Sequence, residues 1–224
     1  MSIYRFIVCM FVIMHSVDVV SNSAALNVWC QLKKGNKSFM RSDKSRRKKL
    51  ACAGQNPCTI VLSCSDSRVP PELVFKQNIG DLFVVRVAGE VVDDVVVDSI
   101  EYAVGHYDSV LIVVLGHSKC GAVGGAINRL KENHGQIVER PGHLDAVLRP
   151  IEMAILGAGI DIYAYNALEL SIIANVEYVA NQLLYQSHLI HDALAVGDIS
   201  IIGAEYNLAS GKVSTLFTWN TLPD

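Results

Sequence analysis

Two short apolar segments of the sequence each end in side chains that can bind a metal ion. Residues 59–63 run directly into Cys64, and residues 109–115 are followed by His117 and Cys120. Both segments have the length and composition of buried strands, and the carboxyl ends of neighbouring parallel strands meet at one edge of a sheet. Two thiolates and an imidazole together favour zinc in tetrahedral geometry. A single buried cysteine is usually only a small apolar side chain, but the position of both groups directly after strand ends predicts a metal site.

The side chain of Asp66 decides what kind of metal site this is. Asp66 lies two residues after Cys64 and two residues before Arg68. A carboxylate can be a fourth zinc ligand, which gives a closed, structural site. Alternatively, Arg68 can pair with both carboxylate oxygens and hold Asp66 off the metal, which leaves the fourth position open as in catalytic zinc sites. The spacing favours the catalytic form, and a structural zinc or anion-binding protein is the alternative.

The elements that must position these side chains alternate between strands and helices. We expect strands at residues 59–63, 81–87, 109–115, 199–204 and 212–218. We expect helices at residues 94–106, 121–132, 141–156 and about 166–194. This alternation predicts one α/β domain with a central, mainly parallel β-sheet covered by helices, in which the last two strands form a hairpin or edge pair. No glycine-rich phosphate loop follows a strand, which excludes a nucleotide-binding sheet.

The composition is that of a single folded domain. The chain has 224 residues, of which 51% are hydrophobic and 18% charged, and its mean hydropathy is +0.32. These values exclude disordered and low-complexity proteins. The 19 basic and 22 acidic residues give a net charge of −3, which argues against a general nucleic-acid binder. No apolar run reaches the roughly 18 residues that a membrane-spanning helix needs.

The basic residues are concentrated near the amino terminus. Residues 33–49 hold nine of the 19 basic side chains and a single acid, so this segment carries +8 and the rest of the chain −11. We therefore expect a single domain over residues 26–224 that begins with an extended N-terminal helical arm and loop, residues 26–58. The basic arm could pack on an acidic body, its own or a partner subunit's, or it could bind phosphate or anionic lipid.

Residues 1–25 have the features of a signal peptide. Nine apolar residues at 6–14 match the core of such a peptide and are too short to cross a bilayer. This segment predicts export to a bacterial periplasm or secretion, with the mature chain beginning near residue 24–26. A cytoplasmic protein with a buried N-terminal helix is the alternative. In an oxidising compartment Cys52 and Cys58 could form a disulfide, the alternative being two free thiols.

Beyond the site itself, a series of motifs resembles one enzyme family. The segments CSDSRVPPE and GHSKCGAV, which begin at residues 64 and 116, resemble the two metal-site motifs of the β-class carbonic anhydrases. The similarity extends over about residues 32–220 and includes, in matching order, GNKSF (35–39), GQNP (54–57), GDLFVVRVAG (80–89), VVDDVV (91–96) and SIEYAV (99–104). Glu90 and Asp98 depart from the family pattern, which often has Asn and Gly at these positions.

The resemblance implies a zinc lyase, carbonic anhydrase, that converts carbon dioxide to bicarbonate and a proton and back. It implies Zn2+ as cofactor, with Cys64, His117 and Cys120 as ligands. Asp66 and Arg68 would form a catalytic dyad that orients a zinc-bound hydroxide, with Asp66 a possible fourth ligand in an inactive state. Hydrolysis of carbon disulfide or carbonyl sulfide by the same kind of site is the alternative reaction.

The resemblance also implies a substrate pocket and an assembly. The substrate-binding residues would be Gln55, Phe83, Ala88, Tyr102 and Gly121, with Gln55 donating a hydrogen bond to the substrate. Because pocket residues in this family come from two subunits, the implied unit is a homodimer or a higher oligomer based on dimers. We expect carbon dioxide and bicarbonate as ligands, no nucleic-acid partner and no stable membrane span.

Overall fold

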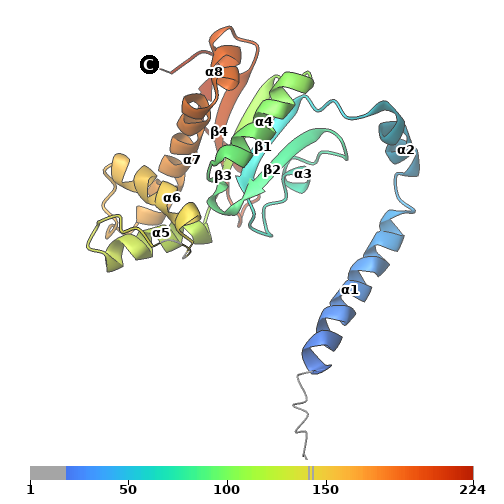
Figure 1. The fold of residues 1–224 in the computed structure, drawn as a ribbon, viewed down its shortest axis with the longest axis horizontal. Helices are drawn as coiled ribbons and strands as arrows, with labels where there is room; N and C mark the ends of the chain where they lie inside the picture. The colour runs from blue at the N-terminus through green and yellow to red at the C-terminus, as the bar shows by residue number, and fades with distance from the viewer. Residues whose placement is uncertain (1–18, 141, 143, 224) are drawn as a thin grey trace, which may run out of the picture. The chain divides into compact units, whose positions relative to one another are not determined.

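The computed structural model describes residues 19–223 except residues 141 and 143 (Figure 1). The apolar run at residues 6–14 lies outside the described residues. The chain divides into two compact units, residues 1–53 and residues 54–224. Within the described residues, none of the helices is both long and apolar enough to cross a bilayer.

The N-terminal unit contains two helices, α1 (Val19–Phe39) and α2 (Lys44–Ala53). The basic segment 33–49 forms the end of α1 and the first part of α2, so the expected arm is helical. Helix α1 also runs through residues 24–26, where the sequence predicts that the mature chain begins. No side chain of α2 is buried, and α1 exposes the large apolar side chains of Leu26, Val28, Trp29, Leu32 and Phe39. This unit therefore presents apolar surface that its two helices do not bury between them.

The second unit is built on a five-stranded sheet with the strand order β2-β1-β3-β4-β5. Its strands are β1 (Thr59–Cys64), β2 (Leu82–Val87), β3 (Leu111–His117), β4 (Ser200–Tyr206) and β5 (Val213–Trp219). Strands β2, β1, β3 and β4 are parallel, and β5 pairs antiparallel with β4. The expected mainly parallel sheet with an edge pair is confirmed. Strands β1 and β3 are neighbours, so their carboxyl ends lie side by side.

Helices cover this sheet mainly on one face. The helical elements are α3 (Pro71–Val74), the 3-10 turn η1 (Ala88–Glu90), α4 (Asp94–His106), α5 (Gly121–Glu132), α6 (Asp145–Gly157), α7 (Ala167–Gln186) and α8 (His188–Ala195). Helices α4, α7 and α8 bury one face in a core that includes Ile60, Ile112 and Leu183, each fully buried. The opposite face has a smaller core around Val61 and Val113.

The single helix that the sequence predicts over about residues 166–194 is divided in two. Ser187 separates α7 from α8 and is fully buried. Its hydroxyl accepts a hydrogen bond from the amide of Ile190 (3.0 Å) and donates one to a carboxylate oxygen of Glu101 in α4 (2.5 Å). A serine that caps the next helix in this way replaces the continuing helical hydrogen bonds. The apolar periodicity of the segment does not reveal such a break.

Candidate metal centre

Three side chains that can bind a metal converge beyond the carboxyl ends of β1 and β3. Cys64 is the last residue of β1, His117 is the last residue of β3, and Cys120 directly precedes helix α5. Their ligand atoms all lie within 4.8 Å of one another, and all three side chains are buried. The structure therefore brings together the three residues that the sequence predicts as ligands, because adjacent parallel strands end at the same edge of the sheet.

The surroundings of His117 leave one of its ring nitrogens available. Nδ1 lies 3.0 Å from the carbonyl oxygen of Ser118, and a carbonyl can only accept, so Nδ1 carries the proton. Nε2 is buried and has no hydrogen-bond partner among the described residues. Metal-binding histidines commonly donate their second nitrogen to a carbonyl in this way. A borderline cation between Nε2 and the two sulfur atoms fits this donor set.

The two sulfur atoms of the site hold their protons unequally. The hydrogen bond from the Cys120 thiol lowers the pKa of Cys64 to about 4. The amide of Gly89, which lies 3.3 Å from Sγ of Cys64, acts in the same direction. The same sulfur–sulfur hydrogen bond, together with burial, raises the pKa of Cys120 above its usual range. A cation bound between the two sulfurs would replace the proton of their hydrogen bond.

Arg68 holds the carboxylate of Asp66 with three hydrogen bonds. Its Nε donates to Oδ1 (2.9 Å), its Nη2 donates to Oδ2 (2.6 Å), and its backbone amide donates to Oδ1 (2.9 Å). This is the bidentate pair that the spacing predicts. The side-chain hydrogen bonds from Arg68 hold the pKa of Asp66 well below its ordinary value, so the carboxylate is ionised and can only accept. Its Oδ2 lies 3.9 Å from Nε2 of His117, which places the carboxylate beside the metal-binding group.

Arg86, which no sequence motif identifies as a site residue, fixes the loop that follows β1. Its Nε donates to the carbonyl oxygen of Cys64 (3.1 Å), and its Nη2 donates to the carbonyl oxygen of Asp66 (2.6 Å). The backbone between the first ligand and the acid is therefore held from the neighbouring strand β2. A single charged side chain within the otherwise apolar strand LFVVRV is the signal that could have identified it.

Glu90 and Asn175 lie behind the ligands and were not predicted as site residues. Glu90 is 1% exposed and Asn175 is fully buried. Nδ2 of Asn175 donates to the carbonyl of Gly89 (2.9 Å) and to Oε1 of Glu90 (3.0 Å). Burial, together with the negative charge of Cys64, raises the pKa of Glu90 to about 8. The sequence shows Glu90 only as a departure from a family pattern, and Asn175 lies in a helix without any distinguishing signal.

Three of the expected substrate-binding residues lie away from the ligands of the same chain. Gln55 donates from Nε2 to the hydroxyl of Tyr107 (2.8 Å). The rings of Phe83 and Tyr102 lie 6.1 Å and 5.8 Å from that of Tyr107. This cluster adjoins the amino end of β1, whereas Cys64 is at its carboxyl end, and a six-residue strand separates its two ends by about 17 Å.

The other two expected pocket residues lie next to the metal centre in the chain. Ala88 is exposed and precedes Gly89, whose amide contacts Cys64. Gly121 is exposed, begins helix α5 and follows Cys120. The expected pocket residues thus fall into two groups at opposite ends of the sheet.

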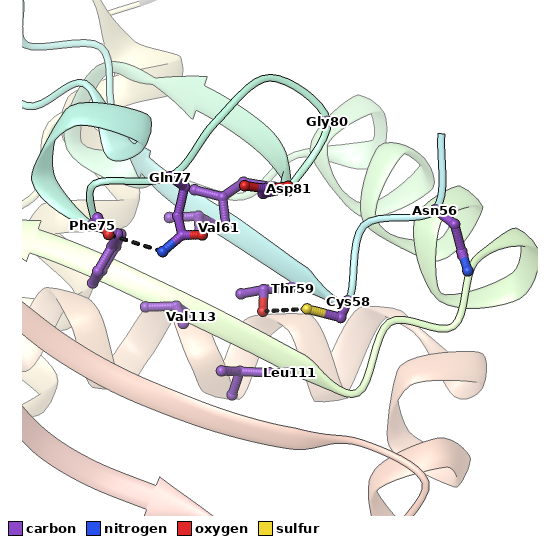
Figure 2. Close-up of a pocket in the computed structure, with 11 residues that line it drawn as sticks. Asn56, Cys58, Thr59, Val61, Phe75, Gln77, Gly80, Asp81, Leu111 and Val113 are labelled. Atoms are coloured by element: carbon purple, nitrogen blue, oxygen red, sulfur yellow. Dashed lines mark hydrogen bonds between the residues drawn. The ribbon is translucent and has the colours of Figure 1, made fainter. Parts of the chain in front are cut away.

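Two cavities lie at the two ends of the strands. One of about 510 Å³ adjoins the Asp66–Arg68 pair and is lined by Arg68, Ser118, Lys119, Glu169 and Glu205, among others. The other, of about 470 Å³, lies over the amino ends of β1 and β3, and Figure 2 shows Val61, Leu111 and Val113 among the side chains that line it. Cys58 lines this second cavity; it and Cys52 are exposed free thiols.

Comparison with known proteins identifies relatives of this chain. Residues 59–213 match the family model described as "Carbonic anhydrase". A carbonic anhydrase of Mycolicibacterium smegmatis is 37% identical over 200 residues, which cover 86% of this chain and 93% of the relative. Carbonic anhydrase 2 of Mycobacterium tuberculosis is 35% identical over 199 residues, which cover 85% of this chain and 92% of the relative.

Solved structures share the fold. The β-carbonic anhydrase CafA of the fungal pathogen Aspergillus fumigatus is 25% identical with a TM-score of 0.71, over 91% of this chain and 93% of that chain. A structure from the ascomycete Sordaria macrospora, described as a tetrameric β-carbonic anhydrase, is 26% identical with a TM-score of 0.66, over 88% of this chain and 95% of that chain.

Proposed function

Because this chain belongs to the β class of the carbonic anhydrase family, whose cofactor is zinc, we propose that Cys64, His117 and Cys120 hold the zinc ion. We propose in addition that Asp66 and Arg68 act as the catalytic pair in the reversible hydration of carbon dioxide to bicarbonate and a proton. The observation that carries this proposal is the convergence of the three buried donors within 4.8 Å, beside a carboxylate that is already held by an arginine.

The residues of the site fit a zinc ion. Two sulfur atoms, one of them with its pKa lowered to about 4, face an imidazole nitrogen that is buried and has no partner among the described residues. Thiolate and imidazole are the ligands that zinc prefers. When bound, zinc supplies a Lewis acid that makes an oxygen nucleophile available near neutral pH.

Asp66 would orient the attacking nucleophile. An ionised carboxylate has no hydrogen to donate, so it accepts the hydrogen of the nucleophilic oxygen and turns a lone pair of that oxygen toward carbon dioxide. The hydrogen bonds from Arg68 use Oδ1 twice and Oδ2 once, and a carboxylate has acceptor capacity left on Oδ2. Oδ2 is the oxygen that lies 3.9 Å from Nε2 of His117, so its remaining capacity is next to the ligands.

Arg68 separates this function from that of a structural zinc protein. A free aspartate beside three ligands could complete the coordination and close the site. Here both carboxylate oxygens are engaged by the guanidinium fork, at 2.9 Å and 2.6 Å, which favours a carboxylate that stays off the metal.

Two substitutions, measured by stopped-flow carbon dioxide hydration and zinc content, test the proposal. Asp66→Ala should keep stoichiometric zinc and lose on the order of 10²-fold in hydration rate, because the nucleophile is no longer oriented. Cys64→Ala should lose zinc. Asp198→Ala, at an exposed aspartate, is the matched control and should change neither. If Asp66→Ala loses zinc to the same extent as Cys64→Ala, Asp66 is a permanent ligand and the site is structural.

We also propose that the functional unit is a homodimer or a higher oligomer built from dimers. Gln55, Phe83 and Tyr102 adjoin the amino end of β1, away from Cys64 of the same chain. If they serve catalysis, they serve the metal centre of a second copy. The Sordaria macrospora relative, described as tetrameric, is consistent with such an assembly.

A further inference from the structure

We infer that Asn175, in the middle of helix α7, is a positioning residue for the metal centre. It holds the turn η1 in the conformation from which the Gly89 amide donates to the sulfur of Cys64. The inference rests on the proposed role of Cys64 as a ligand, and it assigns to α7 a part in metal binding that no contact with the metal would reveal.

The contacts form a continuous path from helix to ligand. The side-chain amide of Asn175 has two hydrogens, and Nδ2 donates to the Gly89 carbonyl (2.9 Å) and to Oε1 of Glu90 (3.0 Å). Both of its donor hydrogens are thus used within one turn. The amide of Gly89 in turn donates to Sγ of Cys64 (3.3 Å).

The turn adopts a conformation that must be held in place. Gly89 has φ +66° and Glu90 has φ +44°, so two successive residues lie in the left-handed region. For a residue with a side chain this region is sparsely populated, and holding it there costs on the order of 1 kcal/mol or more. The turn is also packed closely, because a Cβ at Gly89 would lie 2.7 Å from Cδ1 of Ile151 and 3.0 Å from Cβ of Ala122. The packing restricts where the turn lies, and Asn175 fixes the direction of its peptide groups.

Glu90 depends on Asn175 for its hydrogen bonding. Its carboxyl group is buried, its Oε1 accepts from Asn175, and its Oε2 has no hydrogen-bond partner among the described residues. Loss of the side-chain amide of Asn175 would leave the buried carboxyl of Glu90 and the buried carbonyl of Gly89 without their hydrogen-bond donor. Because unpaired buried polar groups are costly, the turn would then rearrange. The Gly89 amide would then no longer point at Cys64.

The Gly89–Cys64 hydrogen bond bears on metal binding because it stabilises the charged sulfur. A thiolate ligand keeps its negative charge in the metal complex, and a backbone donor aimed at the sulfur stabilises that charge and fixes the direction of the sulfur. Partners of this kind behind the ligands typically account for roughly 10- to 100-fold in metal affinity. Asn175 acts one step further back, through the turn.

The test compares Asn175→Leu with Asn181→Leu, measuring the zinc dissociation constant by competition with a chromogenic chelator. Asn181 is the matched control because it lies on the same helix, is exposed and donates to the carbonyl of Glu177 in its own helix (3.0 Å). We expect Asn175→Leu to weaken zinc binding roughly 10-fold or more and Asn181→Leu to remain within about twofold of the wild type. Glu90→Gln keeps an oxygen that can accept from Asn175, so its zinc affinity should stay closer to the wild type than that of Asn175→Leu.

A spectroscopic measurement separates positioning from general destabilisation. In the cobalt-substituted protein, a thiolate that has lost a hydrogen bond gives a sulfur-to-metal charge-transfer band at longer wavelength. We expect this shift in Asn175→Leu and not in Asn181→Leu. If Asn175→Leu does not fold, Asn175→Ala, which introduces no new bulk, takes its place with the same expectations. Wild-type zinc affinity and an unshifted band in the folded variant would overturn the inference.

One more variant keeps this inference distinct from the proposed function. Cys64→Ala in the same assays should abolish tight zinc binding. If Cys64→Ala loses zinc while the Asn175 variant binds it normally, the inference fails and the ligand set stands. If Cys64→Ala keeps stoichiometric zinc, the ligand set itself is wrong.

Discussion

Asp66 is the residue on which the chemical character of this site depends. Its carboxylate lies 3.9 Å from Nε2 of His117, and rotation of the side chain toward that nitrogen would bring the carboxylate among the proposed ligands. Three hydrogen bonds from Arg68 oppose that rotation, and Arg86 fixes the backbone carbonyl of Asp66 from the neighbouring strand. Under the proposed function, these arginine side chains rather than the ligands decide whether Asp66 stays off the metal.

Removing the guanidinium of Arg68 should lower the hydration rate by more than the loss of an ordinary hydrogen bond would. In Arg68→Ala the freed Asp66 can turn toward the ligands and occupy the open position, since a carboxylate is an acceptable fourth ligand for zinc. We expect normal zinc content, a loss of hydration rate on the order of 10²-fold, and Asp66 coordinated in a crystal structure of the variant. Arg68→Lys keeps the charge but lacks the planar guanidinium fork, so its hydration rate should lie between those of the wild type and Arg68→Ala. Wild-type turnover in Arg68→Ala would show that Asp66 needs no restraint.

Site residues could be predicted from the sequence where their side-chain type is itself unusual at that position, and could not be predicted where their role depends on tertiary contacts. Cys64, His117 and Asp66 could be predicted because their types are unusual directly after strands. Asn175 could not, since the role we infer for it arises from a contact with Gly89, 86 residues away in the chain, that only the folded α7 creates. Arg86 is intermediate, because its charge stands out within an apolar strand but its acceptors are two backbone carbonyls that no motif specifies.

Among the elements, helices α5 and α6 form the support for Cys120, which lies at the start of α5. Arg129 of α5 donates to both carboxylate oxygens of Glu152 in α6, at 2.5 Å and 2.7 Å, and to Asp145 at 3.0 Å. Glu152 is fully buried and Arg129 is 6% exposed, so this is an ion pair inside the protein. Removing one partner of such a pair is strongly destabilising, because the other partner remains as an unpaired buried charge.

We expect Arg129→Met to lower the free energy of unfolding by about 3–5 kcal/mol. The double variant Arg129→Met with Glu152→Met should recover much of this loss, because both fully or almost fully buried charges are then gone and Asp145, the other partner of Arg129, is partly exposed (17%). Denaturant unfolding of the zinc-loaded proteins measures both. The matched control is Arg149→Met, whose partner Glu139 is 67% exposed and whose loss should cost less than about 1 kcal/mol. Equal effects at Arg129 and Arg149 would contradict the assignment of a buried pair.

The bounds of a helix could be predicted well from the sequence where the helix buries one clear apolar face. The helices expected at 94–106 and 121–132 have those bounds in the structure, because each begins after a turn and has a clear apolar face. The helix expected at 141–156 begins instead at Asp145. The break at Ser187 is set by a hydrogen bond to Glu101, which is a tertiary contact and therefore invisible to periodicity.

At the scale of the whole molecule, the N-terminal unit carries a high positive charge that its own acidic residues do not balance, and it exposes apolar side chains that its own helices do not bury. Residues 33–49 carry +8 and the rest of the chain −11. The apolar side chains of α1, Trp29 among them, are exposed. Both features lead us to expect a helical arm that packs against an acidic body, either that of its own chain or that of a second copy.

The apolar run at residues 6–14 leads us to expect that the chain is exported and cleaved near residue 24–26. Because helix α1 extends from Val19 to Phe39, cleavage there would remove only its first turns. N-terminal sequencing of the protein from its native cell measures this directly. A charged substitution in the run, Val8→Asp, should prevent processing. An intact Met1 in the wild-type protein would contradict export by this segment.

Complementation between two inactive variants tests whether Gln55 of one chain acts at the metal centre of the other chain in a dimer. His117→Ala lacks a proposed ligand but keeps Gln55, and Gln55→Ala keeps the ligands but lacks the proposed substrate contact. In a mixed dimer, one site then combines intact ligands from one chain with an intact Gln55 from the other, while the second site lacks both. With random reassortment, half of the dimers are mixed and each has one complete site, so mixing should restore about a quarter of wild-type hydration activity. Light scattering confirms that each parent is dimeric. If both parents are dimeric and exchange subunits without any recovery, Gln55 does not act on the partner's metal centre, and an active monomer would exclude the shared site altogether.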